Sequence, residues 1–177
     1  MERTVNKNKV YSGKILNVFC DDALAENGNP CIREYVHHPG GVCLLAVVDS
    51  KVAFVRQYRY AISRPFLELP AGKLEEGEDP YVAGLRELRE ETGLIADSLI
   101  PMGKMIPTVG YSDEVIYLYL AKGLTRGETD PDEDESLVTE WIDLDLAIGM
   151  ASDGRIEDAK SALLLLRAAK YLQEKNL

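Results

Sequence analysis

Three glutamates at close spacing, Glu87, Glu90 and Glu91, are the residues of this sequence best suited to do chemistry together. In a helix, positions i, i+3 and i+4 share one face, where like charges repel by about 0.2–0.5 kcal/mol per pair. Divalent cations that prefer oxygen ligands would relieve this repulsion, which predicts a metal site. A solvated acidic stripe on a helix surface is the alternative. Arg86 points about 100° away from Glu87 around the helix, so we expect it to orient another carboxylate, such as Glu78.

The segment that must position these carboxylates has the signals of a complete helix. Asp79 is a favourable N-cap, and Pro80 suits the first helical position. Gly93 is a favourable stop after the last periodic residue. We therefore expect a helix that runs from Pro80 through Glu91.

The rest of the chain predicts short strands separated by turns, with two further helices. Apolar residues at helical spacing predict a helix that begins near Glu157 and a short helix over residues 144–151. Trp141 is expected to pack in the core. These elements favour an α+β fold with a mixed sheet between helices. The expected strands are Val10–Phe19, Cys31–His38, Val42–Val48, Val52–Tyr58, Ile100–Pro107, Val115–Ala121 and Val138–Ile142.

The charge balance excludes some classes of protein. The 177 residues include 30 acidic and 20 basic side chains, for a formal net charge of −10. A nonspecific nucleic-acid binder or a protein that binds anionic membranes would need a basic surface, so we expect neither partner. An acidic protein that handles phosphates needs metal ions to offset its own carboxylates.

The cysteines and the apolar segments bear on the compartment. Cys20, Cys31 and Cys43 show no spacing typical of a zinc site or a disulfide framework, which favours reduced thiols. Residues 1–10 are polar and lack the apolar core of a signal peptide. The run Val42–Val48 is far shorter than the roughly 20 residues that span a bilayer. We expect a soluble, cytoplasmic protein.

The stretch from Gly72 to Leu94 resembles the Nudix box, G-x5-E-x7-R-E-U-x-E-E-x-G-U, in which U is aliphatic. A chance match of all these positions in a chain of average composition is on the order of 10⁻⁷. The resemblance implies a Nudix-type α/β/α sandwich with a mixed β-sheet over residues 41–177, preceded by a strand-rich N-terminal extension over residues 1–40. The matching positions are Gly72, Glu78, Arg86, Glu87, Leu88, Glu90, Glu91, Gly93 and Leu94.

The resemblance also implies an activity and a set of metal ligands. Nudix hydrolases cleave a nucleoside diphosphate linked to another moiety, by attack of water on phosphorus with Mg²⁺ or Mn²⁺. Carried over by position, Glu87 and Glu91 are the first metal ligands, followed by Glu90 and the backbone carbonyl of Ala71. The structural positions of the motif are Gly72, Glu78, Arg86 and Gly93.

Residues before the box resemble the ADP-ribose pyrophosphatase branch of the family. The segments Val55–Tyr60 and Leu67–Gly72 carry this resemblance, which implies that Arg56, Arg59 and Glu68 contact the adenosine diphosphate part of the substrate. Arginine is well suited to phosphate because its planar fork donates two hydrogen bonds at once. The alternative is that the arginines at this strand end pair with nearby glutamates.

Two later segments extend the resemblance. Val109 stands where the loop of that branch carries the proline of S-P-G, and Glu114 follows this loop as a candidate substrate contact. A plain junction between loop and strand is the alternative for Glu114. The acidic run from Glu128 to Glu135 reads mostly as a solvated loop. The resemblance nevertheless makes Glu133 and Glu135 equal candidates for the catalytic base.

The expected function is Mg²⁺-dependent hydrolysis of ADP-ribose, or of related ADP-sugars, to AMP and ribose 5-phosphate. The same chemistry on GDP-mannose or NADH is the first alternative. A nucleotide-sugar sensor without catalysis is the second, although such proteins usually lose box carboxylates. The family branch also implies a homodimer, and in that branch the N-terminal strands commonly cross to the partner.

Overall fold

The computed structural model describes residues 1–129 and 137–175. These residues form two compact units. The first unit contains Met1–Gly40 together with Ile106–Val115, and the second contains the rest of the described chain. The domain division expected at residue 40 stays a prediction, and the structure groups residues 106–115 with the N-terminal segment.

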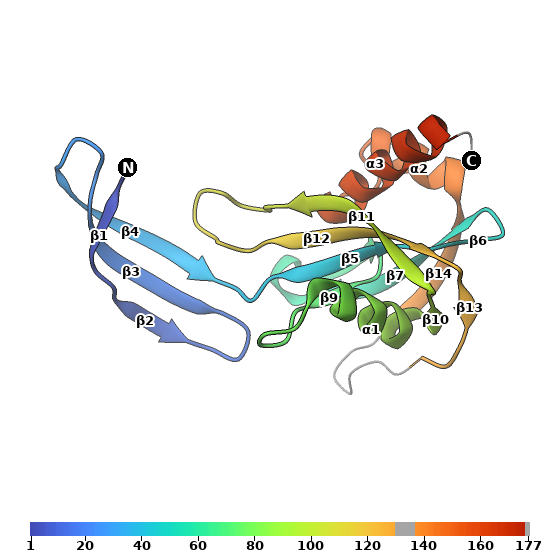
Figure 1. The fold of residues 1–177 in the computed structure, drawn as a ribbon, viewed down its shortest axis with the longest axis horizontal. Helices are drawn as coiled ribbons and strands as arrows, with labels where there is room; N and C mark the ends of the chain where they lie inside the picture. Colours follow the sequence, from blue (N-terminus) through green and yellow to red (C-terminus); the bar gives the residue numbers. More distant parts are fainter. Residues whose placement is uncertain (130–136, 176–177) are drawn as a thin grey trace. The chain divides into compact units, whose positions relative to one another are not determined.

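The first unit is built on a four-stranded antiparallel sheet with β3 at its centre (Figure 1). One edge of β3 pairs with β4 along its whole length, and β1 and β2 share the other edge. The segment 106–115 adds to β4, because the Val36 N–H donates to the Tyr111 carbonyl at 2.7 Å. The strands are β1 (Arg3–Asn6), β2 (Lys9–Ser12), β3 (Asn17–Leu24) and β4 (Pro30–His37).

The single strand predicted over Val10–Phe19 is wrong. The structure has two strands there, joined by a tight turn in which the Gly13 N–H donates to the Leu16 carbonyl at 2.9 Å. A Cβ at Gly13 would lie 2.8 Å from the Tyr11 ring, so a larger residue there would have to push this exposed ring aside. The β-forming residues on both sides of Gly13 masked this turn signal.

The second unit contains a mixed sheet in the order β11-β12-β5-β9, in which only the pairing of β12 with β5 is parallel. A second sheet has the order β14-β7-β6, with β8 also paired to β7, and β10 pairs with β13. The strands are β5 (Gly41–Leu45), β6 (Val47–Val48), β7 (Lys51–Arg59), β8 (Arg64–Glu68), β9 (Ala71–Lys73), β10 (Leu94–Ile95), β11 (Ser98–Met105), β12 (Ile116–Lys122), β13 (Thr125–Arg126) and β14 (Val138–Asp143). A 3-10 turn, η1 (Tyr60–Ile62), lies between β7 and β8.

Helices cover both faces of the sheets of the second unit. Helix α1 (Pro80–Thr92) lies on one side, and α2 (Leu144–Ser152) and α3 (Ala159–Lys175) lie on the other (Figure 1). Strand β5 contacts helices on both of its faces. Cys43 and Leu45 pack in the cluster with α2 and α3, whereas Val42 and Leu44 pack with α1. Alternate residues of a strand face opposite sides, so a strand buried on both faces reads as a continuous apolar run. The predicted α+β fold with a mixed sheet between helices is confirmed.

Helix α1 has the ends that the sequence predicts. The Asp79 carboxylate accepts hydrogen bonds from the N–H groups of Tyr81 and Val82, and Pro80 occupies the first turn. Gly93 ends the helix in the left-handed conformation, at φ 68°. These local caps determine where the glutamate face of α1 begins and ends.

Two further expectations need correction. The apolar run Val42–Val48 is two strands, because the chain passes at Ala46 from the sheet of β5 to the sheet of β6. Trp141 is not a core residue; it is 36% exposed on β14, the end strand of its sheet, and the Arg126 guanidinium lies 5.9 Å from its ring centroid.

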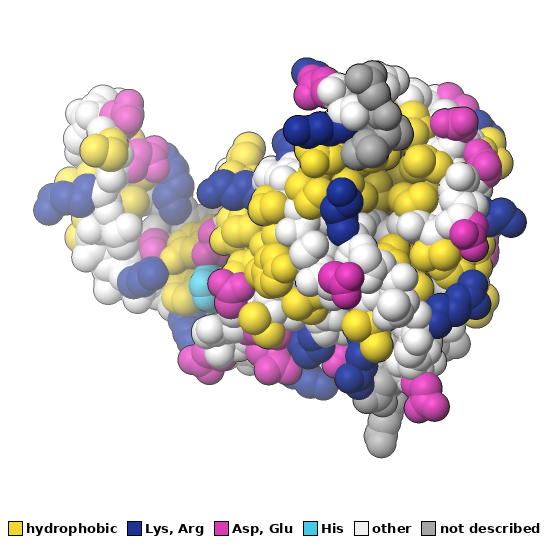
Figure 2. Space-filling model, turned by 45° about the vertical axis from the view of Figure 1, so that its right-hand side comes forward, with side chains coloured by type: hydrophobic (Ala, Val, Ile, Leu, Met, Phe, Trp, Pro, Cys, Tyr) yellow, Lys and Arg dark blue, Asp and Glu magenta, His cyan; other side chains and the backbone are white. Residues whose placement is uncertain are grey.

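On the face shown in Figure 2, lysine and arginine side chains are scattered among acidic and hydrophobic ones and form no continuous basic surface. Within residues 1–129 and 137–175, no helix is both long and apolar enough to cross a membrane.

Candidate active site

The glutamates of α1 meet the backbone of β9. A Cβ built on Gly72 would lie 1.9 Å from Cδ of Glu87, so the Glu87 carboxylate fills the space that only glycine leaves open. The Glu91 carboxylate, 5% exposed, accepts a hydrogen bond from the Ala71 N–H at 2.9 Å. Two carboxylates from one helix face therefore lie against the peptide units of Ala71 and Gly72.

The Arg86 guanidinium donates hydrogen bonds to three carboxylates of the Nudix box. Arg86 donates to both oxygens of Glu78 at 2.9 Å, which confirms the expected partner. Its Nη1 also donates to Glu87 at 2.8 Å and to Glu90 at 2.9 Å. The 100° between Arg86 and Glu87 around the helix does not separate them, because the arginine side chain is long enough to turn back. The hydrogen bond to Glu78 is the largest of the effects that raise the pKa of Arg86. The same bond lowers the pKa of Glu78.

The predicted metal ligands fit a hard cation in their chemistry, although they are not gathered around one point. Among the residues that the structure describes, no three Asp, Glu, His or Cys side chains form a cluster that could hold a metal ion. Arg86 holds Glu87 and Glu90, and the Ala71 N–H holds Glu91. All the donors are oxygens from one helix face and the adjoining strand, as Mg²⁺ requires.

The arginines near the end of β7 pair with glutamates, as the alternative interpretation had it. Arg56 binds Glu140 through Nε, and its Nη2 donates to the same carboxylate at 3.1 Å. Both side chains are partly exposed. Arg64 also pairs with a glutamate at the surface, donating from Nη2 to Glu157. These pairs do not test whether Arg56 also binds substrate.

Glu68, itself buried, lies in a partly buried ion network that sequence reasoning missed. Arg59 donates to its two oxygens at 2.6 and 2.7 Å, and the Lys160 ammonium contacts the same carboxylate and lies 3.0 Å from Asp158. Burial would raise the pKa of Glu68, but the two cations outweigh it and the pKa is lowered. Burial would likewise lower the pKa of Lys160, but Asp158 and Glu68 outweigh it and the pKa is raised. No sequence signal linked Lys160 to Glu68, because the two residues lie 92 positions apart.

The remaining predicted residues lie elsewhere or outside the described chain. In the first unit, the Glu114 carboxylate lies 3.5 Å from Nδ1 of His38, and its role toward substrate stays a prediction. Glu133 and Glu135 lie outside the described residues. The acidic run begins beside the end of α1, because the Gly127 N–H donates to the Gly93 carbonyl at 2.6 Å.

Comparison of the sequence with family models identifies the family of this chain. Residues 37–165 match the family model for the NUDIX domain. The chain belongs to the Nudix family. The matched range contains β5–β14 and α1, and with them the whole Nudix box.

Individual relatives agree with this assignment. An ADP-ribose pyrophosphatase of Bacillus subtilis is 37% identical over 177 residues, which covers 98% of this chain and 94% of the relative. A methanol dehydrogenase activator of Bacillus methanolicus is 38% identical over 175 residues, covering 97% and 92%. The crystal structure of an ADP compounds hydrolase superposes with a TM-score of 0.86 at 22% identity, over 98% of this chain and 95% of that one. The Nudix fold is therefore confirmed, and the protein is a Nudix hydrolase, a family that generally uses divalent metal ions.

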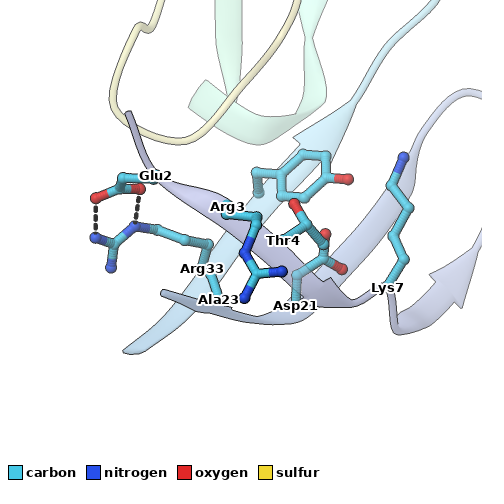
Figure 3. A pocket seen from close by; sticks show the side chains of 8 residues that line it. Glu2, Arg3, Thr4, Lys7, Asp21, Ala23 and Arg33 are labelled. Carbon is cyan, nitrogen blue, oxygen red and sulfur yellow. Dashed lines mark hydrogen bonds and ion pairs between the residues drawn. The ribbon is translucent and has the colours of Figure 1, made fainter. Parts of the chain in front are cut away.

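The first unit contains a cavity of about 240 Å³ (Figure 3). All the residues that line it come before residue 37, where the match to the NUDIX model begins. Basic and acidic side chains both line it, and Arg33 donates from Nε to Glu2 at 2.8 Å. Because charges of both signs offset one another there, we assign the cavity no step of Nudix chemistry. Its lining residues are Glu2, Arg3, Thr4, Lys7, Asp21, Ala23, Arg33 and Tyr35.

Proposed function

We propose that this protein hydrolyses the pyrophosphate bond of ADP-ribose, and of related ADP-sugars, to AMP and ribose 5-phosphate by attack of water on phosphorus. The observation that carries the proposal is the placement of Glu87 and Glu91 against the backbone of Ala71 and Gly72, within a complete Nudix box. The choice of substrate is supported by the Bacillus subtilis relative, which is named for ADP-ribose and matches nearly the whole chain.

The carboxylates of Glu87, Glu90 and Glu91 and the carbonyl of Ala71 would hold Mg²⁺, with Mn²⁺ as the alternative cation. Bound there, the cation would neutralise the diphosphate and stabilise the charge that develops on the leaving phosphate. Arg86 offsets the repulsion between Glu87 and Glu90, which would otherwise disfavour this face of α1.

The attacking water loses a proton to a carboxylate, for which Glu133 and Glu135 remain the candidates. The described start of their acidic run supports this role. Glu128 and Arg89 line one depression of about 410 Å³, together with Ile95 and Thr129. The run therefore begins at the C-terminal end of the helix that carries the metal-binding glutamates.

The substrate's diphosphate would be bound by Arg56 and Arg59. The surface pair of Arg56 with Glu140 contributes at most about 1 kcal/mol, so a phosphate can replace Glu140 at little cost. Arg59 binds Glu68 through Nε and Nη2, which leaves Nη1 as the nitrogen that would meet a phosphate. Glu68 is 2% exposed, so it would act on substrate through Arg59. Glu114 remains a proposed contact.

The proposal includes a homodimer in the cytoplasm, with exchange of the N-terminal strands as one form of this dimer. Every residue of β1 and β2 is exposed. Several large apolar side chains are more than half exposed on the sheet of the first unit, namely Val5, Val10, Tyr11 and Ile32. Apolar side chains on an uncovered sheet support burial against a second copy.

Initial rates of the purified protein with Mg²⁺ test the proposed activity. The panel is ADP-ribose, other ADP-sugars, GDP-mannose, NADH and 8-oxo-dGTP, with nucleotide products identified by chromatography. We expect AMP from ADP-ribose at the highest kcat/KM. A higher kcat/KM for another compound would keep the Nudix chemistry and overturn the substrate. Binding without turnover of any compound would replace the enzyme with a nucleotide-sugar sensor.

A further inference from the structure

The two residues between β8 and β9 carry the chain from one sheet to the other. Glu68 ends the ladder of β8 with β7, and Ala71 begins the ladder of β9 with β5. Leu69 and Pro70 belong to neither ladder, although both are buried. The orientation of Ala71, whose carbonyl is a proposed metal ligand, therefore depends on the groups that hold this link.

Leu69, Pro70 and the following Ala71 each make a hydrogen bond through the backbone. The Leu69 N–H donates to Oγ of Ser161 at 2.7 Å, and the Pro70 carbonyl accepts from a backbone N–H of β5 at 2.9 Å. The Ala71 N–H then donates to Glu91 at 2.9 Å. A continuous set of hydrogen bonds thus leads from the first turn of α3 to a carboxylate of the Nudix box.

The first turn of α3 holds the link at two points. Asp158 caps the helix by accepting from the N–H of Ser161 at 3.1 Å and from its Oγ at 2.5 Å, which directs the hydroxyl group. Lys160 lies between Asp158 and Glu68 and contacts both carboxylates. Ser161 therefore holds the Leu69 backbone, while Lys160 holds the side chain of the residue before it.

A lysine is poorly placed in the first turn of a helix, where the backbone dipole favours anions. Its burial there adds a further cost, which the carboxylates of Asp158 and Glu68 offset. Buried ion networks are often no more stabilising than apolar residues of the same volume, so this network is weak evidence for stability. What it supplies is a fixed geometry at one end of the β8–β9 link.

We propose that Lys160, Asp158 and Ser161 are positioning residues, which act through Glu68 and Leu69 to set the Ala71 carbonyl and the Glu91 carboxylate for the divalent cation. The inference rests on the proposed function, because it assumes that the cation binds at Ala71 and Glu91. It adds residues more than 60 positions after the Nudix box to the machinery of the site.

The test is Lys160→Met in the full chain, with Mn²⁺ binding followed by the electron paramagnetic resonance signal of free Mn²⁺ in the absence of substrate. We expect the dissociation constant for Mn²⁺ to rise about 10- to 100-fold, as for other residues that orient metal ligands. The kcat for ADP-ribose should fall while its KM changes little, and Lys160→Arg should restore most of the loss. Glu157→Gln is the matched control, since it removes the charge of the surface pair between Arg64 of β8 and the segment just before α3.

The outcomes separate this inference from the proposed function. A wild-type protein that binds no Mn²⁺ and hydrolyses no ADP-ribose would overturn the function itself. An active wild type with unchanged Mn²⁺ affinity in folded Lys160→Met would overturn the positioning role alone. A raised KM with unchanged Mn²⁺ affinity would make Lys160 a substrate ligand instead. Ser161→Ala, which leaves every charge in place, must weaken Mn²⁺ binding even if Lys160→Met does not fold; unchanged binding would again overturn the positioning role.

Discussion

At the scale of single residues, the site combines carboxylates that differ greatly in how firmly they are held. Glu91 is buried and bound to a backbone N–H, whereas Glu90 shares the Arg86 guanidinium with Glu78 and Glu87. A buried carboxylate that a backbone N–H already orients needs less reorganisation to bind a cation. Substitution of Glu91 should therefore reduce activity more than substitution of Glu87 or Glu90.

Glu91→Gln should keep the fold and abolish most of the activity. The amide oxygen of glutamine can still accept from the Ala71 N–H, but a charged metal ligand is lost. We expect kcat to fall on the order of 10³-fold, because such a ligand supports several kcal/mol of transition-state stabilisation. Steady-state kinetics and thermal melts check this, with Glu174→Gln at the exposed end of α3 as the control. Turnover close to that of the wild type would remove Glu91 from the site.

The sequence predicts some residue contacts and cannot predict others. The pairing of Arg86 with Glu78 could be expected because Glu78 lies just before the N-cap of the helix that carries Arg86, and the structure has it. The partner of Arg56 lies 84 residues away, and the contact of Lys160 with Glu68 spans 92 residues. Such pairs depend on how β7, β14 and α3 pack, which no local pattern specifies.

At the scale of elements, local signals determined α1, and long-range pairing determined the short strands. The caps of α1 lie within its own sequence, so its ends could be predicted. Strands β8 and β9 have five and three residues, contain Pro65 and Gly72, and exist because longer strands offer them a ladder. Their absence from the expected strands has this physical cause.

The close approach of β9 and α1 makes Gly72→Ala informative. Gly72 does not have a positive φ, so the backbone accepts alanine, but the new Cβ would overlap the Glu87 carboxylate and force it aside. We expect little change in melting temperature together with a clear loss of kcat and of Mn²⁺ affinity. Gly149→Ala in α2, where the Cβ meets nothing within 4 Å, should stabilise the fold by about 0.5–1 kcal/mol and leave kcat unchanged. Full activity of Gly72→Ala would show that Glu87 is free to move.

At the scale of the whole molecule, several ion pairs, some of which join distant elements, make stability depend on pH. Hydrogen bonds from Arg86 and Arg56 lower the pKa values of Glu78 and Glu140, and Arg59 and Lys160 outweigh burial to lower that of Glu68. A carboxyl whose pKa is lowered by folding stabilises the protein above its unfolded pKa and loses this contribution as pH falls through the folded pKa.

The melting temperature should therefore be steady near neutral pH and fall as the pH drops below the ordinary glutamate pKa of 4.5. Thermal melts across this range measure the effect. Arg86→Gln should show a smaller loss on acidification, because Glu78 then has no guanidinium to lose. A melting temperature that stays constant well below pH 4.5 would contradict the role of these pairs.

The three cysteine thiols differ in accessibility, so the native protein can be labelled selectively. Cys43 is fully buried in β5, and burial raises the pKa of its thiol, so it forms almost no reactive thiolate. Cys20 and Cys31 are partly accessible on β3 and β4. A maleimide fluorophore would thus attach to the first unit alone, and energy transfer between labelled chains would report directly on whether two copies pair through that sheet.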